Sequence, residues 1–206
     1  MRIILIRHGE TYSNTLFNTD KQFLIGALDN ELTQLNEKGK LQAKKAKEKL
    51  ECLGLLNSVD KIYSSDITRA IDTAKIIFDN QEIVQDCRLR ERSHGFLEGV
   101  LMREINENPL YSQMMVSFEK DPVETCLNKK VTDGESYNDV IVRCKDFLSE
   151  LDFEEKSTIA IVSHFHTLRV LVYLLQGKEF DFDFSQLMIE NSNPMIAEYK
   201  KGQFEF

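Results

Sequence analysis

The sequence predicts an α/β protein in which a mostly parallel sheet is covered by helices on both faces. Three short runs rich in β-branched residues, at residues 2–6, 61–65 and 158–163, are typical of buried strands. Segments with helical periodicity separate these runs. Such an alternation indicates parallel strands joined by crossover helices.

The bulk properties narrow the class of protein. The 206 residues can bury a substantial core, and 42% hydrophobic and 29% charged residues are ordinary proportions for a globular chain. A net charge of −8 argues against nucleic acid or an anionic membrane as the main partner. No apolar run approaches the roughly 20 residues of a membrane-spanning helix, and the first predicted strand begins too early to leave room for a signal peptide.

The four cysteines are scattered and form no C-x-x-C pair. Neither a disulfide framework nor a thiolate metal site is therefore expected. No P-loop or cluster of carboxylates suggests a nucleotide–Mg²⁺ site. We expect a cytoplasmic protein with reduced thiols, no metal and no cofactor.

The first helix is predicted over residues 39–53. Ala43, Ala46 and Leu50 share one face of it, and lysines cover much of the remainder. This spacing is typical of an amphipathic helix whose lysines face solvent.

A second helix, with a clear apolar stripe, is predicted over residues 67–78. Asp66 is predicted to cap it. Arg69 lies in the first turn and outside the stripe, where its charge opposes the helix dipole. It has two interpretations: a surface arginine, or an arginine beside a bound anion that offsets the repulsion.

The middle of the chain is less regular. A short strand is predicted at residues 81–85, followed by a charged loop at residues 89–95. Residues 100–130 show no strong periodicity, and Pro109 and Pro122 interrupt them. We predict a lid-like helical insertion here, within a single domain that spans residues 1–206.

The last third of the chain returns to regular elements. Ser136 and Asp139 resemble a capping box at the start of a helix. The helix over residues 166–176 is apolar nearly all round and is expected at the centre of the fold. Beyond it we predict an extended segment in which phenylalanines alternate with aspartates (Phe180, Phe182, Phe184), and closing strands at residues 187–189 and 195–199.

Polar residues follow the three strongest strands. Arg7 and His8 end the first, Ser64 and Ser65 lead from the second towards Arg69, and His164 ends the third. The carboxyl ends of parallel strands meet at one edge of a sheet, where ligands bind in α/β folds. Two arginines offer forked donors that match phosphate oxygens, and a neutral imidazole has a lone pair for nucleophilic attack. A proton donor for the leaving oxygen is still required, and a carboxylic acid suits that role.

Five motifs carry a resemblance to a known family: RHGET, SSDITRAIDTA, LRERSHGFLEG, DGES and VSH. In this order they resemble the motifs of the histidine phosphatase superfamily, also called the phosphoglycerate mutase-like family. They run from Arg7 to His164, about three quarters of the chain. The resemblance implies a three-layer α/β/α sandwich with the site at the carboxyl ends of the strands.

The resemblance also implies roles for individual residues. His8 would accept the phosphoryl group, and Glu91 would protonate the leaving group and then activate water. The phosphate oxygens would be bound by Arg7, Arg69 and His164. Further candidates for contact with the substrate are Thr11, Asn14, Phe165 and His94.

Two histidines and one phenylalanine leave questions open. Phe165 stands where the family usually has glycine, but its backbone N–H can still contact phosphate. His166 is either a helix-capping or core-edge histidine or a further phosphate or substrate contact. His94, close to Glu91, either lines the pocket or faces solvent.

The resemblance includes both phosphatases and mutases. Family mutases carry a basic pair after this point that holds the carboxylate of phosphoglycerate, whereas this chain offers only Arg103 and Lys120, far apart. We therefore favour a phosphatase acting on a small phosphorylated substrate. A cofactor-dependent phosphoglycerate mutase and a non-catalytic phosphate-binding protein are the alternatives, and the resemblance allows a homodimer. Five apolar residues form either a wall for a larger leaving group or the core of the insertion: Phe96, Met102, Met114, Met115 and Phe118.

Overall fold

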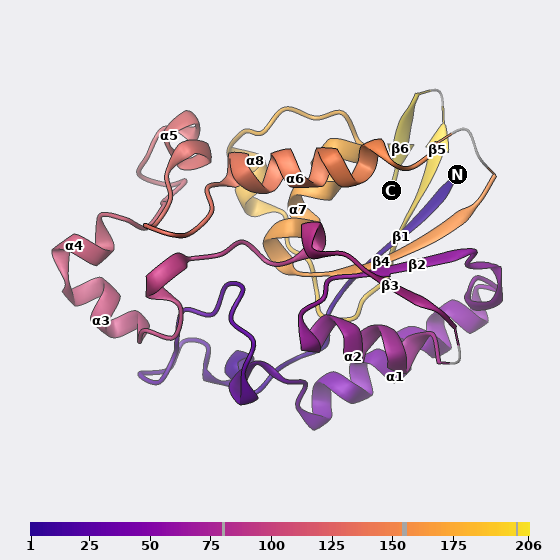
Figure 1. The fold of residues 1–206 in the computed structure, drawn as a ribbon, viewed down its shortest axis with the longest axis horizontal. Helices are drawn as coiled ribbons and strands as arrows, with labels where there is room; N and C mark the ends of the chain where they lie inside the picture. Colours follow the sequence, from indigo (N-terminus) through magenta and orange to yellow (C-terminus); the bar gives the residue numbers. More distant parts are fainter. Residues whose placement is uncertain (80, 154–155, 201) are drawn as a thin grey trace.

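The computed structural model describes residues 1–79, 81–153, 156–200 and 202–206. It has the predicted three layers, with a six-stranded sheet between two groups of helices (Figure 1). The strand order is β3-β2-β4-β1-β5-β6. The strands are β1 (Arg2–Arg7), β2 (Lys61–Ser64), β3 (Ile83–Gln85), β4 (Thr158–Ser163), β5 (Met195–Lys200) and β6 (Gln203–Glu205).

The four strands β3, β2, β4 and β1 are parallel, and β5 and β6 are antiparallel to their neighbours. Arg7 of β1 pairs with Ser163 of β4, and Ser64 of β2 pairs with Val162 of β4. This register brings the ends of the three strands to one edge of the sheet. The predicted convergence of their exits is therefore confirmed.

One face of the sheet is covered by α1 (Glu37–Cys52) and α2 (Thr68–Ile77), seen below the strands in Figure 1. Ile4 and Ile6 of β1 pack there, as do the predicted small residues of α1. Because side chains alternate along a strand, the intervening residues of β1 point to the other face.

The other face is covered by α6 (Tyr137–Ser149), α7 (Phe165–Leu175) and α8 (Phe182–Gln186). Ile3 and Leu5 of β1 belong to the large core cluster that these helices share. Helix α7 is buried along most of its length, as predicted. Among the residues that the structure describes, no helix is both long and apolar enough to cross a membrane.

Residues 100–130 contain three short helices: α3 (Met102–Glu107), α4 (Pro109–Ser112) and α5 (Val123–Asn128). Ile105 of α3 belongs to a small apolar cluster with Leu97 and Val131, and Tyr111 of α4 packs on it, whereas Leu127 of α5 packs on the main core. Met114 and Met115 pack on that cluster, whereas Phe118 packs on the main core. Short 3-10 helices lie at Ser13–Leu16, Glu31–Thr33, Leu56–Ser58, Cys87–Leu89 and Gly95–Leu97.

The start of α6 is as predicted, and the start of α2 is not. Ser136 and Asp139 form the capping box. Asp66 does not cap α2, because Ile67 occupies the N-cap position and makes no side-chain bond. The Asp66 carboxylate instead pairs with Arg90, 2.6 Å from its Nη2. An ion pair formed by the fold has replaced the local cap.

Two predictions near the carboxyl terminus were wrong. Residues 180–184 are not extended, because the Asp181 carboxylate accepts a hydrogen bond from Phe184 N and caps α8. Residues 187–189 form no strand. Their backbone oxygens instead bind two arginine side chains. Ile189 O accepts a hydrogen bond from Arg7 Nη1, and Leu187 O accepts one from Arg169 Nε.

A close backbone contact fixes the loop after β1 on the start of α1. A Cβ atom on Gly39 would overlap the carbonyl oxygen of Glu10. The Asn36 side chain holds the same junction, because its Oδ1 accepts from Gly39 N and its Nδ2 donates to Glu10. The junction positions the segment that begins with His8.

Gly39→Ala is therefore expected to destabilise the fold by about 1–3 kcal/mol, since the added methyl group must displace backbone. Urea denaturation measures this loss. Lys45→Ala, on an exposed position of the same helix, is the matched control and should unfold within about 0.5 kcal/mol of the parent. Equal stability of the two variants would contradict the close contact.

Candidate active site

Two histidines and two arginines meet beyond the carboxyl ends of β1 and β4. The ring centroids of His8 and His164 are 5.2 Å apart, and Arg69 Nε lies 3.3 Å from His8 Nε2. His8 is 5% exposed, Arg69 2% and His164 0%. Arg69 is thus not a surface arginine, although it lies in the first turn of its helix.

The hydrogen bonds of His8 define its tautomer. Nδ1 lies 2.8 Å from Gly9 O, and a carbonyl oxygen only accepts, so Nδ1 carries the proton. Nε2 is then unprotonated, and its lone pair accepts a hydrogen bond from Arg69 Nε. Burial, together with the charges of Arg69 and Arg7, lowers the pKa of His8 well below its usual range. His8 is consequently neutral at pH 7, with Nε2 available for attack.

Backbone carbonyls hold the two arginines in place. Arg69 donates from Nη1 to Leu28 O and from Nη2 to Gly26 O, each at 2.9 Å. Burial lowers the pKa of Arg69 to about 10, so it stays charged at pH 7. Arg7 donates from Nη1 to Ile189 O at 2.8 Å, and its guanidinium lies 4.8 Å from the centroid of the Phe165 ring.

Several buried polar side-chain atoms have no partner within the described part of the chain. Among them are Nε of Arg7 and the two ring nitrogens of His164, of which a neutral ring donates from one and accepts at the other. Buried polar groups are nearly always hydrogen-bonded in folded proteins, so such groups beside a cavity point to a ligand. An anion with several acceptor oxygens, such as phosphate, suits the cations and donors gathered here.

Glu91 lies at the amino terminus of α7. Its carboxylate accepts from His166 N at 3.1 and 3.2 Å, from Thr167 N at 3.4 Å and from Arg92 N at 2.9 Å. The first-turn amides of His166 and Thr167, together with Arg92 N, orient this carboxyl group. Glu91 is 7% exposed.

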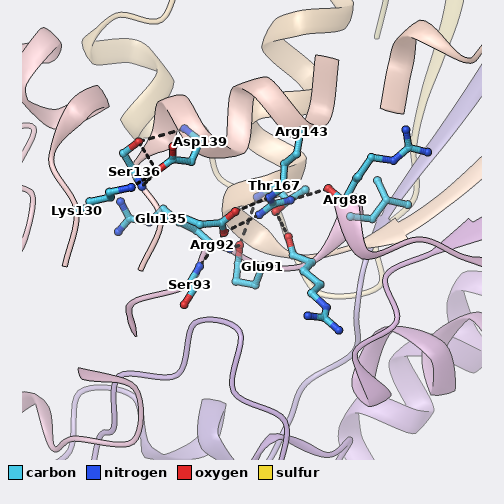
Figure 2. Close-up of polar contacts among 12 residues, drawn as sticks. Arg88, Glu91, Arg92, Ser93, Lys130, Glu135, Ser136, Asp139, Arg143 and Thr167 are labelled. Atoms are coloured by element: carbon cyan, nitrogen blue, oxygen red, sulfur yellow. Dashed lines mark hydrogen bonds and ion pairs between the residues drawn. The ribbon is translucent and has the colours of Figure 1, made fainter. Parts of the chain in front are cut away.

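Side chains from α6, from α7 and from the residue before the N-cap of α6 hold the segment that carries Glu91 (Figure 2). Arg143 Nη1 donates to Arg88 O, and Glu135 accepts from Ser93 N and pairs with Arg143. Thr167 Oγ1 donates to the backbone oxygen of the residue before Glu91. Sequence reasoning gave none of these three side chains a role, and only Glu135 stood in a quoted motif.

A cavity of about 500 Å³ opens beside this cluster. It is lined by all of the predicted site residues except His164, whose ring lies against that of His8. Asn14 Oδ1 accepts from Thr11 N at 3.0 Å, and Thr11 Oγ1 lies 2.8 Å from Ser13 Oγ. Asn191, which sequence reasoning missed, donates from Nδ2 to His8 O at 2.8 Å.

The two further histidines belong to this neighbourhood. His94 is 6% exposed and therefore does not face solvent; its Nδ1 lies 3.5 Å from Arg92 Nη2. His166 lines the cavity, and its Nδ1 lies 2.7 Å from the Tyr137 hydroxyl. Its side chain does not cap α7, whose N-cap residue is His164.

We expect the unfolding free energy to fall at acid pH, because the buried histidines resist protonation. Burial, with the charge of Arg92 beside it, lowers the pKa of His94 to about 3. From about pH 6.5 down to that value the unfolded chain binds a proton at this position that the folded chain does not. Stability is therefore lost as the pH falls, by about 1.4 kcal/mol per pH unit for this histidine.

Urea denaturation at pH 7.0 and 5.5 measures this dependence. His94→Asn should lose less stability than the parent over the same interval, which isolates the histidine from the carboxylates. The same pH dependence in parent and variant would show that His94 titrates normally.

Comparisons with known proteins place this geometry in a family. A model of the histidine phosphatase superfamily (branch 1) matches residues 3–206. A 2,3-bisphosphoglycerate-dependent phosphoglycerate mutase of Corynebacterium diphtheriae is 30% identical over 222 residues, covering 96% of this chain and 85% of that protein. Phosphoserine phosphatase 1 of Hydrogenobacter thermophilus is 30% identical over 180 residues, covering 86% of this chain and 77% of that protein.

Solved structures share the fold. The crystal structure of the alpha-ribazole phosphatase from Shigella flexneri superposes with a TM-score of 0.81 at 22% identity, covering 99% of this chain and 93% of that chain. The family resemblance and the fold class inferred from the sequence are confirmed. The chain is an enzyme of the histidine phosphatase superfamily, branch 1.

Proposed function

We propose that this enzyme is a metal-independent phosphatase that hydrolyses a small phosphomonoester through a phosphohistidine on His8. The observation that carries this proposal is the fixed tautomer of His8, whose unprotonated Nε2 lies 3.3 Å from Arg69 Nε. Phosphoryl transfer needs mainly positioning and neutralisation of charge. Arg7, Arg69 and His164 offer both beside that nitrogen.

In the first step, Nε2 of His8 attacks the phosphorus in line with the leaving oxygen. The N–P bond forms as the P–O bond breaks, and the leaving oxygen takes its proton from the Glu91 carboxylic acid. The two arginines and His164 hold the equatorial oxygens. The products are the alcohol and a phosphohistidine beside the Glu91 carboxylate.

In the second step, the Glu91 carboxylate takes a proton from water as the water oxygen attacks the phosphorus. The N–P bond breaks, its electron pair returns to Nε2, and inorganic phosphate forms. Glu91 is again protonated and His8 neutral, so the cycle closes. The bond from His8 Nδ1 to Gly9 O keeps Nε2 as the reacting nitrogen in both steps.

The charges around the cavity favour a phosphatase over a phosphoglycerate mutase. Among the described residues that line the cavity, Arg7 and Arg69 are the only arginines, and there is no lysine. Both lie beside His8, at the end of the cavity that we call the phosphate corner. Arg103 and Lys120 are exposed and do not line it. A mutase must also bind the carboxylate of phosphoglycerate, for which the described lining residues offer no further arginine or lysine.

We further infer that residues 1–206 form one domain in which residues 100–130 act as a lid-like insertion. Met102, at the start of α3, lines the cavity and also packs on the small cluster of the insertion. This residue links the insertion to the site.

The test of the proposed function is release of phosphate from para-nitrophenyl phosphate with EDTA present. We expect the rate to change less than about twofold on chelation, because arginines neutralise the phosphate. Rapid quenching should trap an acid-labile, base-stable phosphoenzyme. Loss of activity in EDTA that added metal restores would contradict the metal-free mechanism. Isomerisation of phosphoglycerate with a bisphosphoglycerate primer would support the mutase, and phosphate binding without turnover would support a non-catalytic protein.

A further inference from the structure

We propose that the substrate is a phosphomonoester with an uncharged, apolar leaving group, which binds the outer part of the active-site cavity. The inference rests on the proposed phosphatase function. It names the class of ester that the cavity selects.

The charges of the cavity oppose a second anionic group on the substrate. Beyond the phosphate corner, the described lining residues include no arginine or lysine. The acidic residue there, Glu10, is paired with Lys38 at 2.7 Å and bound by Asn36 at 2.9 Å. A carboxylate on the leaving group would lose water without gaining a cation, which is unfavourable.

Apolar side chains form the outer part of the cavity. They come from three segments of the chain: Phe17, Phe23, Leu24 and Ile25 from the loop after β1, Met102 from α3, and Met188 from the segment before β5. Phe17 is 65% exposed and Met188 73%, although both are large and apolar. Such side chains at the mouth of a binding cavity gain free energy when a ligand covers them.

Part of this apolar wall, around Leu24 and Met102, is held in shape by backbone hydrogen bonds between the loop and the start of the insertion. Leu24 N donates to Val100 O at 2.9 Å, and Gly99 N donates to Leu24 O at 2.7 Å. Met102 N donates to Gln22 O at 2.8 Å. The loop and the insertion therefore present the wall together, and an apolar group need not order it on binding.

The apolar wall in the structure is built from different residues than the one that the sequence suggested. Of the five apolar residues considered there, Met102 alone lines this cavity. Phe96 packs near Tyr111, and Phe118 packs on the main core. The loop after β1 supplies most of the wall instead.

The experiment measures kcat/KM for methyl, butyl and hexyl phosphate, with 3-phosphoglycerate and phosphoserine as charged esters. All have alkyl leaving groups, so differences report contacts with the leaving group rather than its acidity. We expect about a threefold rise per methylene, so that hexyl phosphate, with five more methylenes, exceeds methyl phosphate about 200-fold. Each charged ester should fall at least about tenfold below butyl phosphate.

The double variant Phe17→Ser, Met188→Ser should lower the ratio of hexyl to methyl phosphate about tenfold. Leu110→Ser is the matched control, because Leu110 is 69% exposed but does not line the cavity, and it should keep the parental ratio. Binding of hexylphosphonate and methylphosphonate, measured by calorimetry, gives the same comparison without turnover.

The outcomes separate this inference from the proposed function. Hydrolysis that does not depend on chain length, or that favours the charged esters, would overturn the inference and leave the phosphatase intact. Equal affinity for the two phosphonates would also overturn it. If the enzyme releases phosphate from none of the esters, the proposed function fails and this inference fails with it.

Discussion

His8→Ala should reduce phosphate release by about 10⁴-fold or more, the scale expected when a covalent nucleophile is removed. Its ring is the one whose free nitrogen faces Arg69 with a defined tautomer. Removing it leaves Arg7, Arg69 and His164 to bind phosphate, so binding should weaken less than turnover. Phosphate release and acid-labile phosphoenzyme, measured on the same preparation, check both expectations.

His164→Ala is the matched comparison, because its ring centroid lies only 5.2 Å from that of His8. This variant should still form the phosphoenzyme, more slowly, since the nucleophile is intact and only a bound oxygen has lost its donor. Phosphoenzyme that persists in His8→Ala and disappears in His164→Ala would reverse the two roles. Circular dichroism of both variants guards against misfolding.

The place of the site was predictable because it follows from strand direction. Arg7, Ser64 and Ser163 end three parallel strands in register, so any polar residues that follow them must meet. The sequence could not decide between the two interpretations of Arg69. Helix position suggested the surface, whereas the backbone oxygens that bury it come from Gly26 and Leu28, in a loop without periodicity.

The wrong predictions have a common physical cause: contacts formed by the fold override the local preferences that short sequence patterns express. Alternation of phenylalanine and aspartate suggested a strand, but a single aspartate cap is enough to start the short helix α8. Asp66 lies where an N-cap residue is expected, but its carboxylate forms an ion pair with Arg90 instead of capping α2. Arg143 carries no signal in the sequence because its partners, Glu135 and the backbone at Arg88, lie 8 and 55 residues away.

Glu91→Gln should have an effect that depends on the leaving group, which separates proton transfer from positioning. Glutamine keeps the shape and an oxygen that can accept from His166 N, so the fold at the start of α7 should survive. It has no acidic proton to give. For an alkyl phosphate, whose leaving oxygen needs that proton, we expect kcat/KM to fall about 10²- to 10⁴-fold.

With para-nitrophenyl phosphate the first step should slow less than about tenfold, because nitrophenolate leaves without a proton. The second step still needs Glu91 to activate water. The phosphohistidine should therefore accumulate, and stopped-flow absorbance should show a burst of one nitrophenolate per enzyme followed by slow turnover. Glu48→Gln, at an exposed position of α1 outside the cavity lining, is the control for the same change of side chain. Equal losses on both substrates with no burst would mean that Glu91 only positions the helix terminus. A burst confined to the aryl ester would mean that the carboxylate held by the amides of α7 transfers the proton in both steps.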